Sequence, residues 1–306
     1  MDFELVIIGG GPAGYAASIY ASRSGIKNTI FDKGDGGGLA SIAPKIENYP
    51  GFESISGSEL TEKMKHHAEK YTDFHLFEEV KKLEKIDDHF KIITEKDEYT
   101  SKTVILATGT EHRKLNAPGE KKLLGKGVSY CATCDGFFFK DKKVAMVGGG
   151  NSALIEAVYL KQIGCKKVYL LHRRDQLRAE KAYEDEAIEK GVEILFNKEV
   201  EKINGEENVE SLTIKDKNKN KTEELQVDGV FISIGVVPQN KLAKQVGIKT
   251  DNKGYIVTDK EMKTNVDGIY AAGDITGGIR QIITAASRGA IAALSSTEAL
   301  GKNYPY

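Results

Sequence analysis

Short apolar runs that end in glycine recur along the chain, and two of them begin the same longer pattern. Leu5–Ile8 leads into glycines at Gly9, and Lys143–Val147 leads into glycines at Gly148. At an offset of 139 residues, positions 7–20 match positions 146–159: an apolar strand, three glycines and an alanine-rich helix. Continuous apolar runs of this length are typical of buried parallel strands. The pattern therefore predicts the same strand–turn–helix unit twice.

Each unit is followed by the same order of elements. An apolar strand ending in glycine returns at 104–109 in the first half and at 230–235 in the second. A turn-rich pair of short strands precedes each return strand, at 90–94 with 98–103 and at 211–215 with 223–227. This order predicts an α/β protein with two Rossmann-like, three-layer, doubly wound domains.

The chain after Pro238 has no glycine fingerprint of its own. Residues 255–258 and 268–272 are predicted strands, and they lead into a predicted helix from Gln281 to Leu300. We interpret this segment as returning to complete the first domain. The prediction is a discontinuous domain of residues 1–113 and 244–306, with residues 114–243 inserted into it.

Composition narrows the function classes. The chain has 306 residues and a formal net charge of −1. It therefore lacks the excess of positive charge that is typical of proteins that bind nucleic acid or an anionic membrane. No apolar run approaches the ~20 residues that span a bilayer, and the N-terminus does not have the pattern of a signal peptide. These features predict a soluble, cytoplasmic protein with no nucleic-acid or membrane partner.

The first glycine fingerprint predicts a dinucleotide site. Gly9, Gly11 and Gly14 follow a strand and open a helix, so backbone amides at the helix start can face a pyrophosphate. The next strand ends in Asp32, where a carboxylate accepts hydrogen bonds from a ribose diol. The alternative is an acid that simply closes a strand at the surface.

The second fingerprint has a different chemistry. Gly148, Gly150 and Ala153 form the turn, and the next strand ends in His172, Arg173 and Arg174, with Arg178 one turn later. No acid occupies the ribose position, and guanidinium groups suit a 2′-phosphate through bidentate hydrogen bonds. The second half therefore predicts an NADPH site and the first half a site for another dinucleotide, FAD. A solvated basic cluster is the alternative.

A close cysteine pair lies between the two fingerprints. The chain has three cysteines, too few for a disulfide scaffold. The Cys131-Ala132-Thr133-Cys134 spacing permits a reversible disulfide and lowers the pKa of one thiol. A packed pair or half a metal site is the alternative, but no second Cys or His pair stands at zinc-ligand spacing, so no metal is predicted. Cys165 is predicted to be a packed residue.

With these motifs, the sequence resembles the low-molecular-weight thioredoxin reductases over essentially its whole length. The matching segments, which occur in the family's order, are Gly9–Gly14, Glu47–Gly51, Ala107–Gly109, Cys131–Gly136, Gly148–Ala153, His172–Ala179 and Ala272–Asp274.

The resemblance implies a role for each matching residue. The residues implied to bind FAD are Gly9, Gly11, Pro12, Ala13, Gly14, Asp32, Lys33, Gly38, Leu39, Asn48, Thr108, Gly109, Gly273, Asp274, Gln281 and Ile282. Those implied to bind NADPH are Gly148, Gly150, Asn151, Ser152, Ala153, His172, Arg173, Arg174 and Arg178. In this family Cys134 attacks the flavin, Cys131 exchanges with the protein substrate, and Asp135 is the general acid.

The resemblance also implies a thioredoxin-like dithiol protein as substrate, a homodimer, and an inserted domain that rotates about hinges near 117–119 and 237–238. Two segments depart from the family pattern. Leu39 stands where the FAD-binding loop commonly has Gln, so backbone contacts replace a side-chain hydrogen bond, and the turn after Asp274 is unusually glycine-rich at Gly277-Gly278.

Three other functions remain open from the residues alone. One is a related FAD and dithiol reductase with another electron donor, such as NADH or a deazaflavin, which the arginine cluster disfavours. The second is a peroxide- or oxygen-reducing flavoenzyme, which usually needs a further dithiol domain. The third is a flavin-dependent redox sensor that binds partners without turnover.

Overall fold

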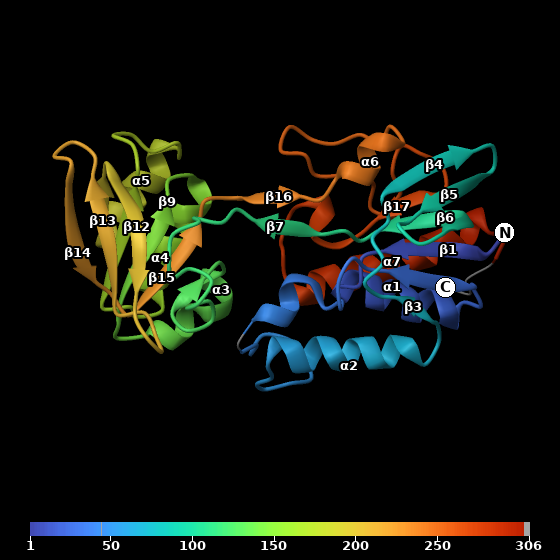
Figure 1. Cartoon of the computed structure of the whole chain (residues 1–306), viewed down its shortest axis with the longest axis horizontal. Helices are drawn as coiled ribbons and strands as arrows, with labels where there is room; N and C mark the ends of the chain where they lie inside the picture. The colour runs from blue at the N-terminus through green and yellow to red at the C-terminus, as the bar shows by residue number, and fades with distance from the viewer. Residues whose placement is uncertain (44, 303–306) are drawn as a thin grey trace. The chain divides into compact units, whose positions relative to one another are not determined.

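The computed structural model describes residues 1–43 and 45–302 and divides the chain into two compact units (Figure 1). The first unit consists of Met1–Glu111 and Val237–Tyr306, and the second, inserted unit is His112–Val236. The second boundary lies earlier in the chain than the sequence pattern suggested. The reason is helix α6 (Lys241–Gln245), whose Leu242 and Ala243 are buried in an apolar core of the first unit.

The first unit is built on a seven-stranded sheet. Its parallel part has the order β3-β2-β1-β6, and β17 pairs with the end of β6. A β4–β5 hairpin continues the sheet in antiparallel sense. The bounds are β1 Phe3–Ile8, β2 Asn28–Phe31, β3 Phe74–His75, β4 Lys82–Ile86, β5 His89–Ile93, β6 Glu98–Leu106 and β17 Ile269–Ala271.

The alternation of side chains along β1 divides the core of this unit into two layers. Leu5 and Ile7 pack with helices α1 (Pro12–Arg23) and α7 (Ile282–Ala299). Val6 and Ile8 pack on the opposite face, with the β4–β5 hairpin and α6. Helix α2 (Gly57–Glu69) contacts α1, and a short 3-10 helix, η1 (Gly38–Ile42), precedes it.

The second unit repeats this plan with a different third layer. Its five-stranded sheet is parallel throughout, in the order β11-β10-β9-β15-β8. Val144 and Met146 of β9 face helices α4 and α5, whereas Ala145 and Val147 face a three-stranded antiparallel sheet, β12-β13-β14. Figure 1 shows this small sheet beside α4 and β9. The bounds are β8 Val128–Ser129, β9 Lys143–Gly148, β10 Lys167–His172, β11 Val192–Phe196, β12 Lys198–Asn204, β13 Ser211–Asp216, β14 Lys221–Gln226, β15 Gly229–Ser233, α4 Asn151–Gln162 and α5 Lys181–Glu189.

The predicted internal repeat is confirmed in the helices. Helix α1 begins at residue 12 and α4 at residue 151, which keeps the offset of 139, and both contain 12 residues. Each is preceded by a glycine with extended backbone, at φ −97° for Gly11 and −106° for Gly150. The predicted return strand at 104–109 is the end of one longer strand, β6, which also includes the predicted strand at 98–103.

The predicted strand at 255–258 is wrong. Ile256 forms only an isolated bridge with Thr250 and a backbone hydrogen bond to Ile275. Its side chain is buried in the core while Val257 is 51% exposed, so this segment covers the core without running along a strand.

The two connections between the units contain the short strands β7 (Thr110–His112) and β16 (Val236–Pro238), which pair with each other. The segment 117–119, a predicted hinge, is instead packed inside the second unit. Ala117 is buried there, and the carbonyl of Pro118 accepts the N–H of Ile203 at 2.9 Å. The other predicted hinge, Val237-Pro238, coincides with the second connection.

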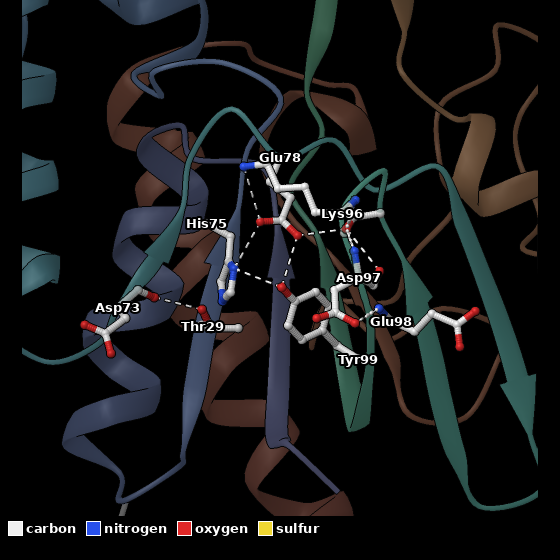
Figure 2. Close-up of polar contacts among 9 residues, drawn as sticks. Thr29, Asp73, His75, Glu78, Lys96, Asp97, Glu98 and Tyr99 are labelled. Carbon is white, nitrogen blue, oxygen red and sulfur yellow. Dashed lines mark hydrogen bonds and ion pairs between the residues drawn. The ribbon is translucent and has the colours of Figure 1, made fainter.

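A buried carboxylate organises the carboxyl end of β2 in the first unit (Figure 2). Glu78, 5% exposed, accepts hydrogen bonds from Thr94 at 2.8 Å and Tyr99 at 3.1 Å. His75 lies 3.3 Å from its other oxygen and stacks on Phe31. Burial by itself would raise the pKa of Glu78, but the hydrogen bonds outweigh burial and lower it.

We expect Glu78→Ala to reduce the free energy of unfolding by about 3 kcal/mol, because Thr94 and the half-buried Tyr99 and His75 would lose their acceptor. Glu79→Ala, at a half-buried neighbouring carboxylate that pairs with Lys81, should change it by less than about 1 kcal/mol. Urea unfolding measures both.

Because the pKa of Glu78 is lower in the folded chain, its contribution to the free energy of unfolding is present at neutral pH and is lost on acidification through the folded-state pKa. The difference in free energy of unfolding between the wild type and Glu78→Gln should therefore become smaller at acid pH. Equal losses for the two alanine variants would contradict this assignment.

Candidate active site and dinucleotide sites

The first fingerprint brings the end of β1 and the start of α1 into a backbone contact that only glycine permits. A Cβ on Gly14 would lie 1.9 Å from the carbonyl oxygen of Gly9, and Gly9 itself has φ +117°. Gly11 differs, because the nearest atom to a Cβ there would be the Cα of Gly38 at 4.0 Å. Gly9 and Gly14 therefore close the turn, whereas Gly11 faces the space between the fingerprint and the Gly38 loop.

Asp32 lies beside this turn, as the sequence suggested. Its carboxylate accepts the N–H of Gly10 at 2.7 Å and the N–H of Gly34 at 2.8 Å. The backbone of Asp32 is fixed in turn by the Glu78 network, since it donates to the carbonyl of His75 and accepts from the N–H of Glu78. Lys33, also implied at the adenosine, forms an exposed ion pair with Glu111.

The loop that departs from the family pattern packs against the fingerprint through its glycines. Gly36, Gly37 and Gly38 all have positive φ, and a Cβ on Gly36 would lie 2.2 Å from the Tyr15 hydroxyl. The N–H of Gly37 lies 2.6 Å from the carbonyl of Gly10 and 3.0 Å from the Tyr15 hydroxyl. The loop thus approaches the fingerprint more closely than side chains would allow, and Leu39 follows it in η1, half-buried.

Residues implied at the flavin end come together from distant parts of the chain. The Asn48 amide donates to the Gln281 side chain at 3.0 Å across 233 residues of sequence. Gln281 caps α7 through a capping box with Thr284, so Ile282 is the first helical residue. An 18-residue helix starting there provides a positive dipole end, which favours negative charge.

Gly273 and Asp274, two further residues implied at the cofactor, lie in a turn that Arg288 supports. Arg288 donates to the carbonyl of Gly277 at 2.5 Å and so holds the turn after Asp274. Burial raises the pKa of Asp274, and the charges of Arg280 and Arg288 oppose this. Gly273 has φ +80°, and a Cβ on it would lie 2.8 Å from the Cβ of Ala13, which is too close for a side chain.

The Thr108 hydroxyl, implied at the cofactor, donates instead to the carbonyl of Gln239 at 2.8 Å. The carbonyl of Gly109 accepts the N–H of the same residue. Both residues therefore hold the segment that returns from the second unit.

In the second unit, His172 lies beneath the fingerprint turn. Its Nδ1 is 2.7 Å from the carbonyl of Gly148 and its Nε2 is 2.9 Å from the carbonyl of Gln176. A Cβ on Gly149 would lie 2.1 Å from the ring. His172 is 6% exposed, so it connects the turn to the arginine loop from within the core. The sequence pattern had grouped it with the arginines.

The arginines are placed differently from His172. Arg173, Arg174 and Arg178 are exposed, and none forms an ion pair with any residue in 1–43 or 45–302. The N–H of Arg178 donates to the carbonyl of Gly149 at 2.8 Å, which brings this loop to the fingerprint. Free guanidinium groups beside a glycine turn can bind an anion.

Asn151, at the start of α4, forms a reciprocal pair with Glu180, with both hydrogen bonds at 2.9 Å. Ser152 is the next residue of the helix, and Ala153 is buried against Gly148. A Cβ on Gly148 would lie 2.5 Å from that of Ala153, whereas no atom of the described residues lies within 4 Å of the corresponding position on Gly150. Gly150 therefore faces open space, as Gly11 does in the first unit.

The close cysteine pair is a disulfide. Cys131 and Cys134 are bonded, with their Cα atoms 5.3 Å apart. Cys131 is the N-cap of the short helix α3 (Ala132–Asp135), and Cys134 lies within that helix. Both cysteines are half-buried. The third cysteine, Cys165, is 3% exposed, and burial raises the pKa of its thiol to about 11, so it is a packed residue as predicted.

Asp135 is a buried acid directly after the disulfide. It is 9% exposed, and burial raises the pKa of its carboxyl while a hydrogen bond from Ser129 lowers it. Its Oδ2 accepts that bond at 2.6 Å, but its Oδ1 is buried with no hydrogen-bond partner among residues 1–43 and 45–302. A carboxyl in this environment is suited to hold a proton and then donate it. Ser129 was not among the residues predicted from the sequence, where its one signal is its place two residues before Cys131.

Residues 3–289 match the family described as pyridine nucleotide-disulphide oxidoreductase. The chain is 43% identical over 295 residues to a thioredoxin reductase of Treponema pallidum, covering 95% of each chain. It is 43% identical over 296 residues to a thioredoxin reductase of Bacillus subtilis, covering 96% of this chain and 93% of that one. A crystal structure of thioredoxin reductase from Streptococcus pyogenes, 41% identical, matches with a TM-score of 0.93 over 98% of both chains.

The chain belongs to the low-molecular-weight thioredoxin reductases of this family. These are FAD-binding, NADPH-using oxidoreductases, and the chain is an enzyme of that class with the family's two-domain α/β fold. Within residues 1–43 and 45–302, the thioredoxin reductase chain has no helix with the length and apolar character needed to cross a bilayer.

We expect Gly150→Ala in this thioredoxin reductase to cost at most about 1 kcal/mol of unfolding free energy, since its φ suits alanine and its Cβ meets no atom. The added methyl should nevertheless raise the KM for NADPH about tenfold by occupying the space that the fingerprint leaves for a pyrophosphate. Gly148→Ala should lose about 2 kcal/mol of unfolding free energy through overpacking. Thermal unfolding and steady-state kinetics separate the two effects. An unchanged KM in Gly150→Ala would place the dinucleotide elsewhere.

Proposed function

We propose that the protein is an NADPH-dependent thioredoxin-disulfide reductase that passes two electrons from NADPH, by way of FAD and the Cys131–Cys134 disulfide, to a thioredoxin-like protein. The observation that carries this proposal is the buried acid Asp135, with one unpartnered oxygen, immediately after that disulfide. A disulfide that only stabilises the fold has no need of a proton donor held out of water.

The first unit is the proposed FAD domain. Three features of this unit fit a dinucleotide: the glycine turn, the Asp32 carboxylate that accepts backbone N–H groups, and the Asn48–Gln281 pair. That pair lies at the start of α7, where the helix dipole favours the negative charge of a reduced flavin. When bound, FAD accepts the hydride of NADPH and supplies its two electrons to the disulfide. Asp32 receives the ribose hydroxyls, Asp274 lies at the ribitol, and the Gly36–Leu39 loop contributes backbone rather than side-chain contacts.

The second unit is the proposed NADPH domain. Gly150 leaves room for the pyrophosphate at the start of α4, and Arg173, Arg174 and Arg178 offer unpaired guanidinium groups for the 2′-phosphate. His172 supports the site by holding the turn and the arginine loop together through their carbonyls.

The dithiol chemistry uses residues of the same unit. Two electrons and two protons convert the disulfide into the thiols of Cys131 and Cys134. The Cys131 thiolate then attacks a disulfide of the partner protein, forming a mixed disulfide and expelling a partner thiolate. Cys134 resolves the mixed disulfide by attacking Cys131, which releases the reduced partner and restores the Cys131–Cys134 bond. Asp135 gives a proton to a departing thiolate.

The deciding experiment is a titration of the purified yellow protein with NADPH, and then with NADH, in the presence and absence of a thioredoxin disulfide. We expect one FAD per chain, bleaching of the flavin by NADPH, and sustained formation of reduced thioredoxin. Negligible oxidation of NADPH would assign a different donor. Flavin reduction without turnover would make the protein a redox sensor, and consumption of NADPH with oxygen or peroxide alone would make it an oxidase or peroxidase.

Donor choice is tested by Arg173→Ala/Arg174→Ala. Charge-assisted bonds of this kind are worth about 10- to 150-fold in binding per residue before non-additivity, so the KM for NADPH should rise strongly while that for NADH changes little. Arg23→Ala, at an exposed arginine in the first unit, is the matched control and should leave both unchanged. Equal losses for the two nicotinamides would show that the arginines support the fold and do not read the phosphate.

We further propose a homodimer, on the strength of the family alone. Light scattering at micromolar concentration should give about twice the chain mass of 33.5 kDa. A single species at the chain mass would contradict it.

A further inference from the structure

Ser129 connects the proposed general acid to the backbone of the disulfide. It is the last residue of β8 and is 4% exposed. Its hydroxyl donates to Asp135 Oδ2 at 2.6 Å and accepts the N–H of Cys131 at 3.0 Å. The carbonyl of Cys131 lies 3.3 Å from the same hydroxyl. One buried oxygen therefore contacts both the acid and the first cysteine of the pair.

The hydroxyl has a single proton, so it cannot donate to the carboxylate and to the Cys131 carbonyl at once. The contact to Oδ2 is the shorter by 0.7 Å, and charge-assisted hydrogen bonds to a carboxylate are the stronger class. The hydroxyl thus donates to Oδ2. Because Oδ2 is already an acceptor, the proton of a neutral Asp135 belongs on Oδ1, the buried oxygen that has no partner in the part of the chain that the structure describes.

We propose that Ser129 is a positioning residue for Asp135: it binds Oδ2 and so directs the transferable proton to Oδ1. This rests on the proposed function only in taking Asp135 as the acid. When a thiolate attacks one sulfur of the Cys131–Cys134 bond, a new S–S bond forms and the other cysteine leaves as a thiolate. That thiolate takes the proton from Oδ1, and the carboxylate that remains is stabilised by the Ser129 hydroxyl.

Among residues 1–43 and 45–302, Ser129 is the one group that shifts the pKa of this carboxyl besides the effect of burial. Burial raises the pKa of Asp135, and the Ser129 hydrogen bond lowers it, with no charged group contributing. Helix α4, which contacts α3, carries Glu156, Tyr159 and Lys161, and η2 (Gly136–Phe139) has no titratable side chain. Tyr130, between Ser129 and Cys131, directs its hydroxyl to Glu120 instead. Removing the Ser129 hydroxyl should therefore raise the pKa of Asp135 further.

The test is reduction of the Cys131–Cys134 disulfide in the FAD-loaded protein by excess dithiothreitol, which is itself oxidised to its cyclic disulfide. N-ethylmaleimide stops the reaction and mass spectrometry counts the modified thiols, with rates divided by the concentration of dithiothreitol thiolate at each pH. Ser129→Ala should slow this step about 10- to 100-fold at neutral pH, the range for losing a hydrogen bond to a charged group. The fall in rate as Asp135 loses its proton should move to higher pH, because removal of the Ser129 hydrogen bond raises the pKa of that carboxyl further.

Two matched variants separate positioning from packing. Ser129→Thr keeps the hydroxyl and should behave like the wild type. Valine has nearly the shape of threonine but no hydroxyl, so Ser129→Val should behave like Ser129→Ala. In an Asp135→Asn background, removing the hydroxyl should change the rate less than twofold, because Ser129 acts through the acid. If Ser129→Ala folds poorly, the Thr and Val pair decides the question, with melting temperatures measured alongside.

Three results would each overturn the inference: equal rates for the Thr and Val variants, an unchanged pH dependence of the rate in Ser129→Ala, or an undiminished effect in the Asp135→Asn background. The assay needs neither NADPH nor thioredoxin. A wild type that passes it but fails to turn over with NADPH and thioredoxin would therefore contradict the proposed function and leave the role of Ser129 standing.

Discussion

The structure depends on a close approach of strand and helix at each fingerprint turn, which glycine makes possible. A Cβ on Gly14 would lie 1.9 Å from the carbonyl oxygen of Gly9, and a Cβ on Gly148 would lie 2.5 Å from that of Ala153 and 2.6 Å from the carbonyl oxygen of Ser233. These contacts set the angle at which α1 and α4 leave their strands, and so aim the first turn of each helix past the end of its sheet. Two neighbouring glycines, Gly11 and Gly150, then remain facing open space. The same geometry that packs the core thus produces the dinucleotide sites.

Three aspartates illustrate how environment assigns different tasks to one residue type. Asp32 accepts two backbone N–H groups, which suits a hydrogen-bond acceptor held beside the fingerprint turn. Asp135 is buried with one hydroxyl partner and one unpartnered oxygen, and its raised pKa suits a proton donor. Asp274 is also shifted upward by burial, but the charges of Arg280 and Arg288 oppose that shift. The chemistry of each site follows from its desolvation and its hydrogen bonds, which the residue name does not reveal.

The two units solve the same packing problem with different layers. Both shield one sheet face with helices, because β1 and β9 alternate apolar side chains toward them. On the other face, the first unit uses the β4–β5 hairpin and the segment around α6, whereas the second uses an antiparallel sheet. The segment around α6 can do this only because the chain returns from the inserted unit, so the first core is completed by residues on both sides of the insertion.

The sequence alone determined the parts that are local. Apolar runs, glycine spacing and a constant offset identified both fingerprints, the disulfide pair and its neighbouring acid, since each is encoded within a few residues. It could not fix the end of the insertion, the irregular path at 255–258, or the partners of His172, Thr108 and Ser129. Those depend on which carbonyls and carboxylates distant segments bring within about 3 Å, the reach of a hydrogen bond. Tertiary structure alone decided that His172 faces backbone while its arginine neighbours face solvent, because burial is a property of the packed chain.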